Sequence, residues 1–206
     1  MNDGVMKVGV MGGSFDPVHL GHISLAVDAL EQTDLDKVVI VPARVQPFKQ
    51  DAHPASGEDR INMLKAAFRD FPEIEFSDFE LEQEGISYTY LTLAAMQEKY
   101  GEDARIYFIC GTDSLLKLHT WKNSDELLDR YSYIVGSRPG YRDEELALEI
   151  DRLRRLHGTE ILKINNRLHN VSSTEIRELI KDGKAIDHLV GSEVDEYIKE
   201  NGLYRQ

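Results

Sequence analysis

Two histidines, His19 and His22, stand three residues apart shortly after the glycine pair Gly12 and Gly13. The apolar run before the glycines predicts a strand, and the apolar spacing after them predicts a helix. Glycines let backbone N–H groups approach a phosphate closely, and the amino end of the following helix carries a partial positive charge. Side chains three apart on a helix share a face. The segment therefore predicts a polyphosphate site served by two imidazoles.

The same residues also allow simpler interpretations. Glycines after a strand often make only a turn, a single His is usually structural, and two His at this spacing also occur as half of a metal site. The segment does not match the dinucleotide fingerprint G-x-G-x-x-G, because its glycines are adjacent and Pro17 interrupts it, and the chain has no P-loop. All eleven residues of 12–22 in this order after a strand favour the phosphate site.

A late serine pair, Ser172 and Ser173, offers a second place for phosphate. One of the two serines is expected to cap a helix that ends near Asp182. A cap and a phosphate site are compatible, because both use the free N–H groups of the same helix end. Arg177, one turn into the helix, would reach the same phosphates as a two-pronged donor.

Strands and helices alternate along the chain and would position these residues. Apolar and β-branched runs predict strands at 5–11, 38–41, 105–110, 133–135 and 160–164. Periodic spacing predicts helices at 20–32, 58–70, 89–100, 124–130, 143–157, 172–182 and from 192 onward, with Ser124 and Ser192 as caps. The alternation predicts an α/β fold, a doubly wound, Rossmann-like parallel sheet. One domain is expected over 1–206, with 172–206 as a C-terminal helical part.

The composition narrows the class of protein. Lys and Arg number 24 against 37 Asp and Glu, a formal net charge of −13, which argues against a general nucleic-acid or membrane-surface binder. The single cysteine, Cys110, excludes an intramolecular disulfide and a Cys-based zinc site. Neither a signal peptide nor a membrane span is indicated, so the expected compartment is the cytoplasm.

The motifs together resemble a known family. Gly12–His22 (GGSFDPVHLGH) resembles the signature of the nucleotidyltransferase superfamily, with His19-Leu20-Gly21-His22 as its H-x-G-H core. The full set resembles the bacterial nicotinate-mononucleotide adenylyltransferases from about Val5 to Tyr204. The further motifs are Pro42 to Lys49 (PARVQPFK), Ser87-Tyr88-Thr89, Gly111-Thr112-Asp113-Ser114 with Trp121, Ser137-Arg138-Pro139-Gly140-Tyr141, and Val171 to Arg177 (VSSTEIR).

This resemblance implies transfer of the adenylyl group of ATP to nicotinate mononucleotide, giving deamido-NAD and pyrophosphate. It implies His19, His22 and Arg177 as catalytic residues, and Mg²⁺ bound mainly through phosphates and water rather than by a protein cage. The implied ATP-binding residues are Gly12, Gly13, Ser14, Phe15, His19, His22, Gly111, Asp113, Ser137, Ser172, Ser173 and Arg177. The implied acceptor-binding residues are Lys49, Ser87, Tyr88, Thr89, Trp121 and Arg138. ATP and nicotinate mononucleotide are the expected partners, and neither a nucleic acid nor a membrane is expected. The sequence leaves open whether the chain forms a homo-oligomer.

Several alternatives accompany this interpretation. Lys49 also fits an exposed loop lysine, and Trp121 also fits plain core packing. The family pattern carries Asp at the position of Leu91, where leucine would suit a buried helix face. The first motif also fits a pantetheine-phosphate adenylyltransferase, a cytidylyltransferase, or a regulatory module that binds a nucleotide without catalysis.

Overall fold

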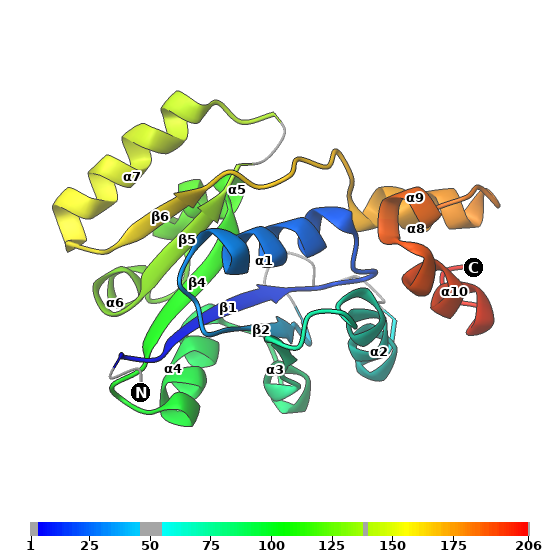
Figure 1. Ribbon diagram of the computed structural model, residues 1–206, viewed down its shortest axis with the longest axis horizontal. Helices are drawn as coiled ribbons and strands as arrows, with labels where there is room; N and C mark the ends of the chain where they lie inside the picture. The colour runs from blue at the N-terminus through cyan, green and yellow to red at the C-terminus, as the bar shows by residue number, and fades with distance from the viewer. Residues whose placement is uncertain (1–3, 46–54, 138–139, 206) are drawn as a thin grey trace.

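The computed structural model describes residues 4–45, 55–137 and 140–205, which contain a six-stranded parallel sheet flanked by helices (Figure 1). The strands are β1 (Lys7–Gly13), β2 (Lys37–Pro42), β3 (Ile74–Phe76), β4 (Arg105–Gly111), β5 (Ser132–Gly136) and β6 (Ile161–Ile164). Their order is β3-β2-β1-β4-β5-β6, and every neighbouring pair is parallel. This confirms the predicted doubly wound sheet. The order reverses between β1 and β4, where such folds open a ligand crevice at the carboxyl ends of the strands.

Helices cover both faces of the sheet and give it two apolar cores. One core joins the sheet to α1 (Leu20–Gln32), α2 (Gly57–Ala67) and the C-terminal helices α8 (Ser173–Lys181), α9 (Asp187–Val190) and α10 (Ser192–Glu200). The other joins it to α4 (Thr89–Tyr100), α5 (Thr112–Lys117), α6 (Ser124–Arg130) and α7 (Asp143–His157). Adjacent residues of β4, Phe108 and Ile109, enter different cores, because successive strand side chains point to opposite faces.

The carboxyl ends of the strands lie level with one another. Gly13 pairs with Pro42 across β1 and β2, and Gly111 pairs with Gly136 across β4 and β5. The segments that follow these strands therefore leave the sheet at the same edge. They contain most of the residues that the sequence marks for chemistry.

Some predicted boundaries and caps were wrong. Ser124 does not cap α6: the cap position is Asn123, in the left-handed region at φ 58°, and Ser124 is the first helical residue. Likewise Gly191, at φ 89°, precedes α10, and Ser192 is its first residue. The first strand begins at Lys7 rather than Val5 and continues through Gly12 and Gly13.

Short elements were not predicted. They are β3, α3 (Phe79–Glu82), α5, the 3₁₀ turn Leu118–Thr120 and α9. Residues 46–54, between β2 and α2, lie outside the described residues.

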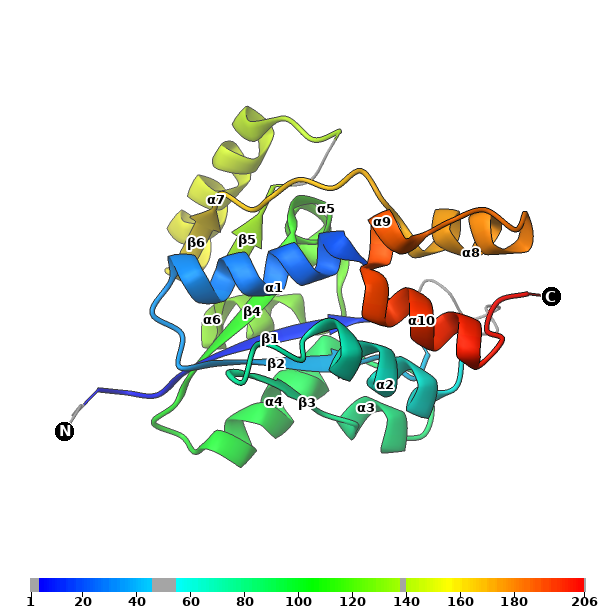
Figure 2. The ribbon, with the colours of Figure 1, turned by 45° about the vertical axis from the view of Figure 1, so that its right-hand side comes forward.

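The C-terminal helices lie beside α2 and the amino end of α1, as Figures 1 and 2 both show. Arg69 on α2 bonds to Glu193 at 2.9 Å, and the Tyr197 hydroxyl donates to Asp59 at 3.0 Å. These contacts bring the end of the chain back toward the first strand. Within the described ranges, no helix is both long enough and apolar enough to span a membrane.

Candidate active site

The loop between β1 and α1 is shaped around a buried phenylalanine. Phe15 adopts φ 48° and is fully buried. A Cβ on Gly13 would lie 2.9 Å from the Phe15 ring, so only glycine lets the backbone pass this close. Because Phe15 is buried, we assign its ring to supporting the loop rather than to ligand contact.

The two histidines stack at the amino end of α1. His19 occupies the cap position, and the ring centroids of His19 and His22 lie 3.7 Å apart with a 21° angle between the planes. The Phe15 ring meets His22 edge-on at 4.9 Å. His19 is only 5% exposed, whereas His22 is half-buried. The prediction that the pair shares one face is confirmed, and His22 is the imidazole more open to a ligand.

Arg177 reaches this loop from α8. Its Nη1 donates to the main-chain oxygen of Asp16 at 2.6 Å and lies 3.5 Å from Asp16 Oδ2, and its Nη2 donates to Thr174 Oγ1 at 3.3 Å. A guanidinium has five N–H donors, so donors remain for a phosphate. The structure thus places Arg177 next to the histidine motif, as a shared phosphate site requires.

The start of α8 is tied to the same loop. Ser172 caps the helix, its Oγ accepting from the Glu175 N–H at 3.2 Å. The Ser173 hydroxyl donates to the carbonyl of Pro17 at 2.9 Å. Two helix amino ends, those of α1 and α8, therefore meet at one loop, and each favours negative charge.

Three residues at this edge escaped the sequence analysis. Asp16 is 5% exposed, and its Oδ1 accepts from the Tyr204 hydroxyl at 2.8 Å and from the Ala55 N–H at 2.9 Å. Burial and the Asp16 carboxylate raise the pKa of Tyr204. Asp16 lay inside the motif and could have been found there, but Tyr204 gave no signal because it is 188 positions away.

Arg60 is the third, a buried arginine that holds loops from two strands. Its Nη1 donates to the carbonyls of Ser14 at 2.9 Å and Ala43 at 2.7 Å, and its Nε donates to that of Ala55 at 3.2 Å. Burial lowers the pKa of Arg60, and the charge of Asp16 opposes this shift. A lone arginine on the apolar side of a predicted helix was the available signal.

A second group of predicted residues gathers where α4 begins. The Ser87 N–H donates to the Val45 carbonyl at 3.0 Å, and Ser87 Oγ accepts from the Arg44 N–H at 3.0 Å. Tyr88 occupies the cap position and Thr89 opens the helix. These bonds hold the Ser87–Thr89 segment beside the chain that leaves β2, at the same edge as the histidine motif.

Trp121 belongs to this second group. It is half-buried and meets Phe108 edge-on at 5.8 Å. The next residue, Lys122, places its Nζ 4.4 Å from the ring centroid of Tyr88, which joins the two predicted motifs. The expectation that Leu91 lies on a buried helix face was wrong: Leu91 is 45% exposed.

A buried carboxylate stands behind the Ser87–Thr89 segment. Glu80 accepts a hydrogen bond from the Thr92 hydroxyl, and it also interacts with Ser87. Burial raises the pKa of Glu80, while these hydrogen bonds and the charge of Arg60 oppose the shift. Glu80 therefore links the second group to the loops that Arg60 holds.

The remaining predicted residues lie at the ends of β4 and β5 or outside the description. Gly111 precedes α5 as its cap, and the Thr112 hydroxyl donates to the Gly136 carbonyl at 3.1 Å. Asp113 lies in the first turn of α5. Ser137 follows β5 and donates to Asp143 at 3.3 Å. Lys49 and Arg138 lie outside the described residues.

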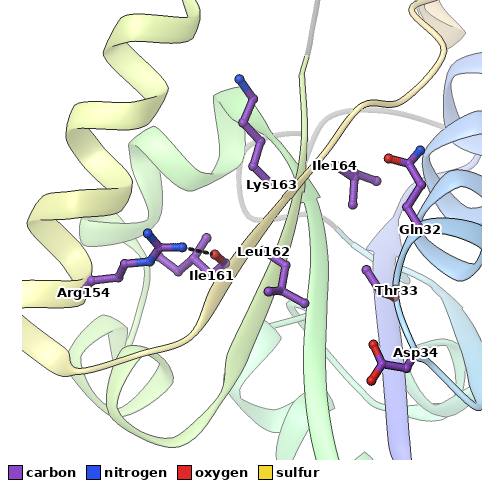
Figure 3. A pocket seen from close by; sticks show the side chains of 8 residues that line it. All are labelled: Gln32, Thr33, Asp34, Arg154, Ile161, Leu162, Lys163 and Ile164. Carbon is purple, nitrogen blue, oxygen red and sulfur yellow. Dashed lines mark hydrogen bonds between the residues drawn. The ribbon is translucent and has the colours of Figure 1, made fainter.

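A cavity of about 310 Å³ lies elsewhere, between β6 and the far end of α1 (Figure 3). In Figure 3 the Arg154 side chain reaches from α7 toward β6, where it donates to the Ile161 carbonyl at 2.7 Å. None of the residues that line the cavity is a predicted site residue. They are Gln32, Thr33, Asp34, Arg154, Ile161, Leu162, Lys163 and Ile164. The cavity is therefore separate from the histidine site at the amino end of α1.

Comparison with known sequences supports the motif assignment. A family profile described as cytidylyltransferase-like matches residues 10–179. A protein of Thermoanaerobacter sp. (strain X514), described as "Probable nicotinate-nucleotide adenylyltransferase", is 35% identical over 201 residues, covering 98% of this chain and 95% of the relative. A protein of Halalkalibacterium halodurans with the same description is 38% identical over 206 residues, covering 97% and 91%.

Comparison with solved structures supports the fold. The nicotinic acid mononucleotide adenylyltransferase of Plasmodium falciparum complexed with NaAD covers 97% of both chains with a TM-score of 0.77 at 20% identity. The same enzyme complexed with APC gives a TM-score of 0.77 at 19% identity. At these identities the likeness extends to the fold alone.

Proposed function

The chain belongs to the cytidylyltransferase-like family and, within it, to the nicotinate-nucleotide adenylyltransferases; on that premise we propose that it transfers the adenylyl group of ATP to nicotinate mononucleotide. The products are deamido-NAD and pyrophosphate. The phosphate of the mononucleotide attacks the α-phosphorus of ATP in line. The bond between the α-phosphorus and the oxygen that bridges it to the β-phosphate breaks. Because the attacking phosphate is already an anion, no general base is required. We propose ATP and the mononucleotide as its partners and the cytoplasm as its compartment.

One observation carries the proposal: the stacked His19–His22 pair, Arg177 and the starts of α1 and α8 all adjoin the loop 14–18. Such an array suits a triphosphate, since each member favours or donates to negative charge. His22 is our choice for the donor to the charge that grows in the transition state. A preorganised donor of this kind is usually the largest part of such catalysis.

The Ser87–Thr89 segment and Trp121 are proposed as the acceptor pocket. Trp121 would stack on the pyridine ring, and backbone N–H groups at the start of α4 would meet the carboxylate. The cationic Lys122 beside Tyr88 adds positive charge to this pocket. Gly111, Asp113 and Ser137, with Arg138, are proposed as the wall against the nucleoside, and Lys49 as a phosphate contact.

We propose Mg²⁺ as the accompanying cation. Within residues 4–45, 55–137 and 140–205, no group of three or more His, Cys, Asp or Glu side chains is placed to hold a metal ion. Mg²⁺ needs no such cage, because it keeps several waters and binds mainly to substrate phosphates. Bound in that way, it would neutralise the leaving pyrophosphate.

The test is pyrophosphate release from ATP and Mg²⁺ with a panel of phosphorylated acceptors. The panel contains nicotinate mononucleotide, nicotinamide mononucleotide, pantetheine phosphate and choline phosphate, and CTP replaces ATP in a parallel series. Turnover highest with ATP and nicotinate mononucleotide supports the proposal. Preference for pantetheine phosphate, or for CTP with an alcohol phosphate, would replace it with another nucleotidyltransferase. ATP binding without any turnover would indicate a regulatory module.

A further inference from the structure

The end of the chain reaches back to the histidine loop. After α10, the chain turns through Gly202 and Tyr204, both at φ 63°. The Tyr204 hydroxyl then donates to Asp16 Oδ1 at 2.8 Å, beside the Ala55 N–H at 2.9 Å. A non-glycine residue at positive φ persists where its surroundings hold it. The contact with Asp16 and the partly buried ring of Tyr204 are such restraints.

Arg177 touches the same residue through other atoms. Its Nη1 bonds to the main-chain oxygen of Asp16 at 2.6 Å, while Asp16 Oδ2 stays 3.5 Å away. Tyr204 therefore binds one carboxylate oxygen of Asp16, and Arg177 faces the other. Asp16 is buried and Arg177 is partly exposed, so the arginine is the member of this chain of contacts that a ligand can reach.

We propose that Tyr204 is a positioning residue for nucleotidyl transfer, which holds Asp16 so that Arg177 stays directed toward the phosphates of ATP. The inference rests on the proposed function for its reaction, but its geometry involves only residues of this chain. Tyr204 itself touches no substrate in this account.

The physical reason is a competition for the guanidinium. Asp16 and the phosphates of ATP are both anions that attract Arg177. While the Tyr204 hydroxyl and the Ala55 N–H occupy Oδ1, the carboxylate cannot turn fully to Arg177, and the closest Arg177 contact is with a neutral carbonyl. Without that hydroxyl, the carboxylate would rotate and form a close ion pair with Arg177, which would withdraw donors from the phosphate. The buried cation Arg60 also attracts Asp16, but its hydrogen bonds to three carbonyls fix its place.

The experiment replaces Tyr204 by phenylalanine and uses Tyr197→Phe as a matched control. Tyr197 also lies in the C-terminal part and bonds through its hydroxyl, but to Asp59 and Asn62 on α2 rather than to Asp16. Y204F should lower kcat/KM for ATP by about tenfold, the scale of one hydrogen bond to a charged group. KM for nicotinate mononucleotide and the thermal midpoint should change no more than in Y197F.

A double-mutant cycle with Arg177→Lys separates positioning from general stability. If Tyr204 acts through Arg177, Y204F should cost little further activity in the R177K background. Equal losses from Y204F in both backgrounds, or equal losses in Y204F and Y197F, would overturn the proposal.

ATP affinity distinguishes failure of this inference from failure of the proposed function. If the unaltered protein releases no pyrophosphate with any acceptor, the proposed function fails, and calorimetric titration with ATP and Mg²⁺ still tests Tyr204. An affinity about tenfold weaker in Y204F than in Y197F supports the positioning role. Equal affinities overturn it.

Discussion

Near the amino ends of the strands, Lys37 and Glu75 bond side chain to side chain, whereas near the carboxyl ends Arg60 and Arg177 donate to main-chain carbonyls. Lys37, at the start of β2, bonds to Glu75, which also accepts from the Tyr100 hydroxyl at 2.8 Å. On the other side of the sheet the Tyr107 hydroxyl donates to Glu160 at 2.7 Å. These polar groups satisfy one another in side-chain pairs that are partly buried.

The carboxyl ends use similar residues differently. Arg60 donates to the carbonyls of Ser14 and Ala43, and Arg177 donates to that of Asp16. A bond from a side chain to a carbonyl fixes the course of a loop without neutralising the charge of the donor. Such a site can retain positive charge for an anionic ligand.

The difference indicates what each end contributes. A partly exposed ion pair such as Lys37–Glu75 adds little stability, so the amino end should tolerate change. A loop held by buried donors is difficult to substitute, because each lost donor leaves a carbonyl unpaired. Substitutions at the carboxyl end should therefore reduce catalysis, and substitutions at the amino end should alter only stability.

The largest expected effect is discrimination between acceptors at the carboxyl end. Nicotinate mononucleotide has a carboxylate where nicotinamide mononucleotide has an amide of similar size. The size of the pocket therefore cannot discriminate between the two acceptors. Backbone N–H groups at the start of α4, with Lys122 nearby, favour the anion. The ratio of kcat/KM at saturating ATP should reach as much as ~10⁴ in favour of nicotinate. Trp121→Ala should weaken both acceptors without erasing the preference, and equal values in the unaltered protein would refute this pocket.

Next comes His22→Ala, which should lower kcat by ~10²–10³ because it removes a preorganised donor. His188→Ala on α9 is the control, since the His188 side chain is 66% exposed and its ring nitrogen lies 3.6 Å from the neighbouring Asp187 carboxylate. Steady-state turnover and circular dichroism of both variants decide the matter. A folded H22A protein with full turnover would remove His22 from the mechanism.

Arg177→Lys should reduce kcat/KM for ATP by about tenfold, because lysine keeps the charge but not the two-pronged geometry. Arg152→Lys is the matched control. Arg152, on the surface of α7, donates to Glu149 through two nitrogens, at 2.8 and 2.6 Å, and Glu149 is not a predicted site residue. Equal values of kcat/KM for ATP in the two variants would mean that Arg177 is only a surface residue of α8 and does not bind the phosphates.

The fold could be predicted because its signals are local. The helices at 20–32, 89–100 and 143–157 were predicted with the bounds found in the structure. Elements of three to six residues, such as β3 and α5, contain too little periodicity to predict. Ser124 and Ser192 are suitable cap residues, but the backbone enters both helices through a left-handed or positive-φ residue just before them.

The site was predicted where its residues are consecutive and missed where the fold assembles them. The segment 12–22 contains both histidines, and 172–177 contains both a cap and an arginine. By contrast, Asp16 meets Tyr204 across 188 positions and Arg60 meets Ser14 across 46. Leu91 was placed wrongly because a leucine suits a buried helix face, yet this side of α4 is exposed.

A smaller effect is expected in the core between the two ends. The Tyr133 hydroxyl is buried and has no hydrogen-bond partner among the described residues. Tyr133→Phe removes this unpaired group and keeps the ring, so it should raise the free energy of unfolding by about 1 kcal/mol. Tyr107→Phe, which removes a hydroxyl bonded to Glu160, is the control and should not stabilise. Urea denaturation measures both, and a destabilised Y133F protein would contradict the assignment.

The smallest effect is expected at the amino end. The hydrogen bond from Lys37 lowers the pKa of Glu75 in the folded protein below its ordinary value of 4.5. The ionised carboxylate therefore stabilises the fold at pH values above 4.5. This contribution is lost as the pH falls through the lowered pKa. Glu75→Gln should cost no more than about 1 kcal/mol at pH 7. The difference from the unaltered protein should shrink in acid, and kcat should not change. A loss of kcat would contradict the division of roles between the two ends.

Hydrogen exchange of the full chain, with and without a non-hydrolysable ATP analogue and Mg²⁺, tests most directly which end of the sheet binds the nucleotide. We expect slower exchange in peptides that cover 12–22 and 172–177, where the two helix amino ends meet at one loop. Peptides that cover 100–107 and 158–161, at the amino ends of β4 and β6, should exchange unchanged. Slower exchange at the amino ends, with none at 12–22, would contradict the account.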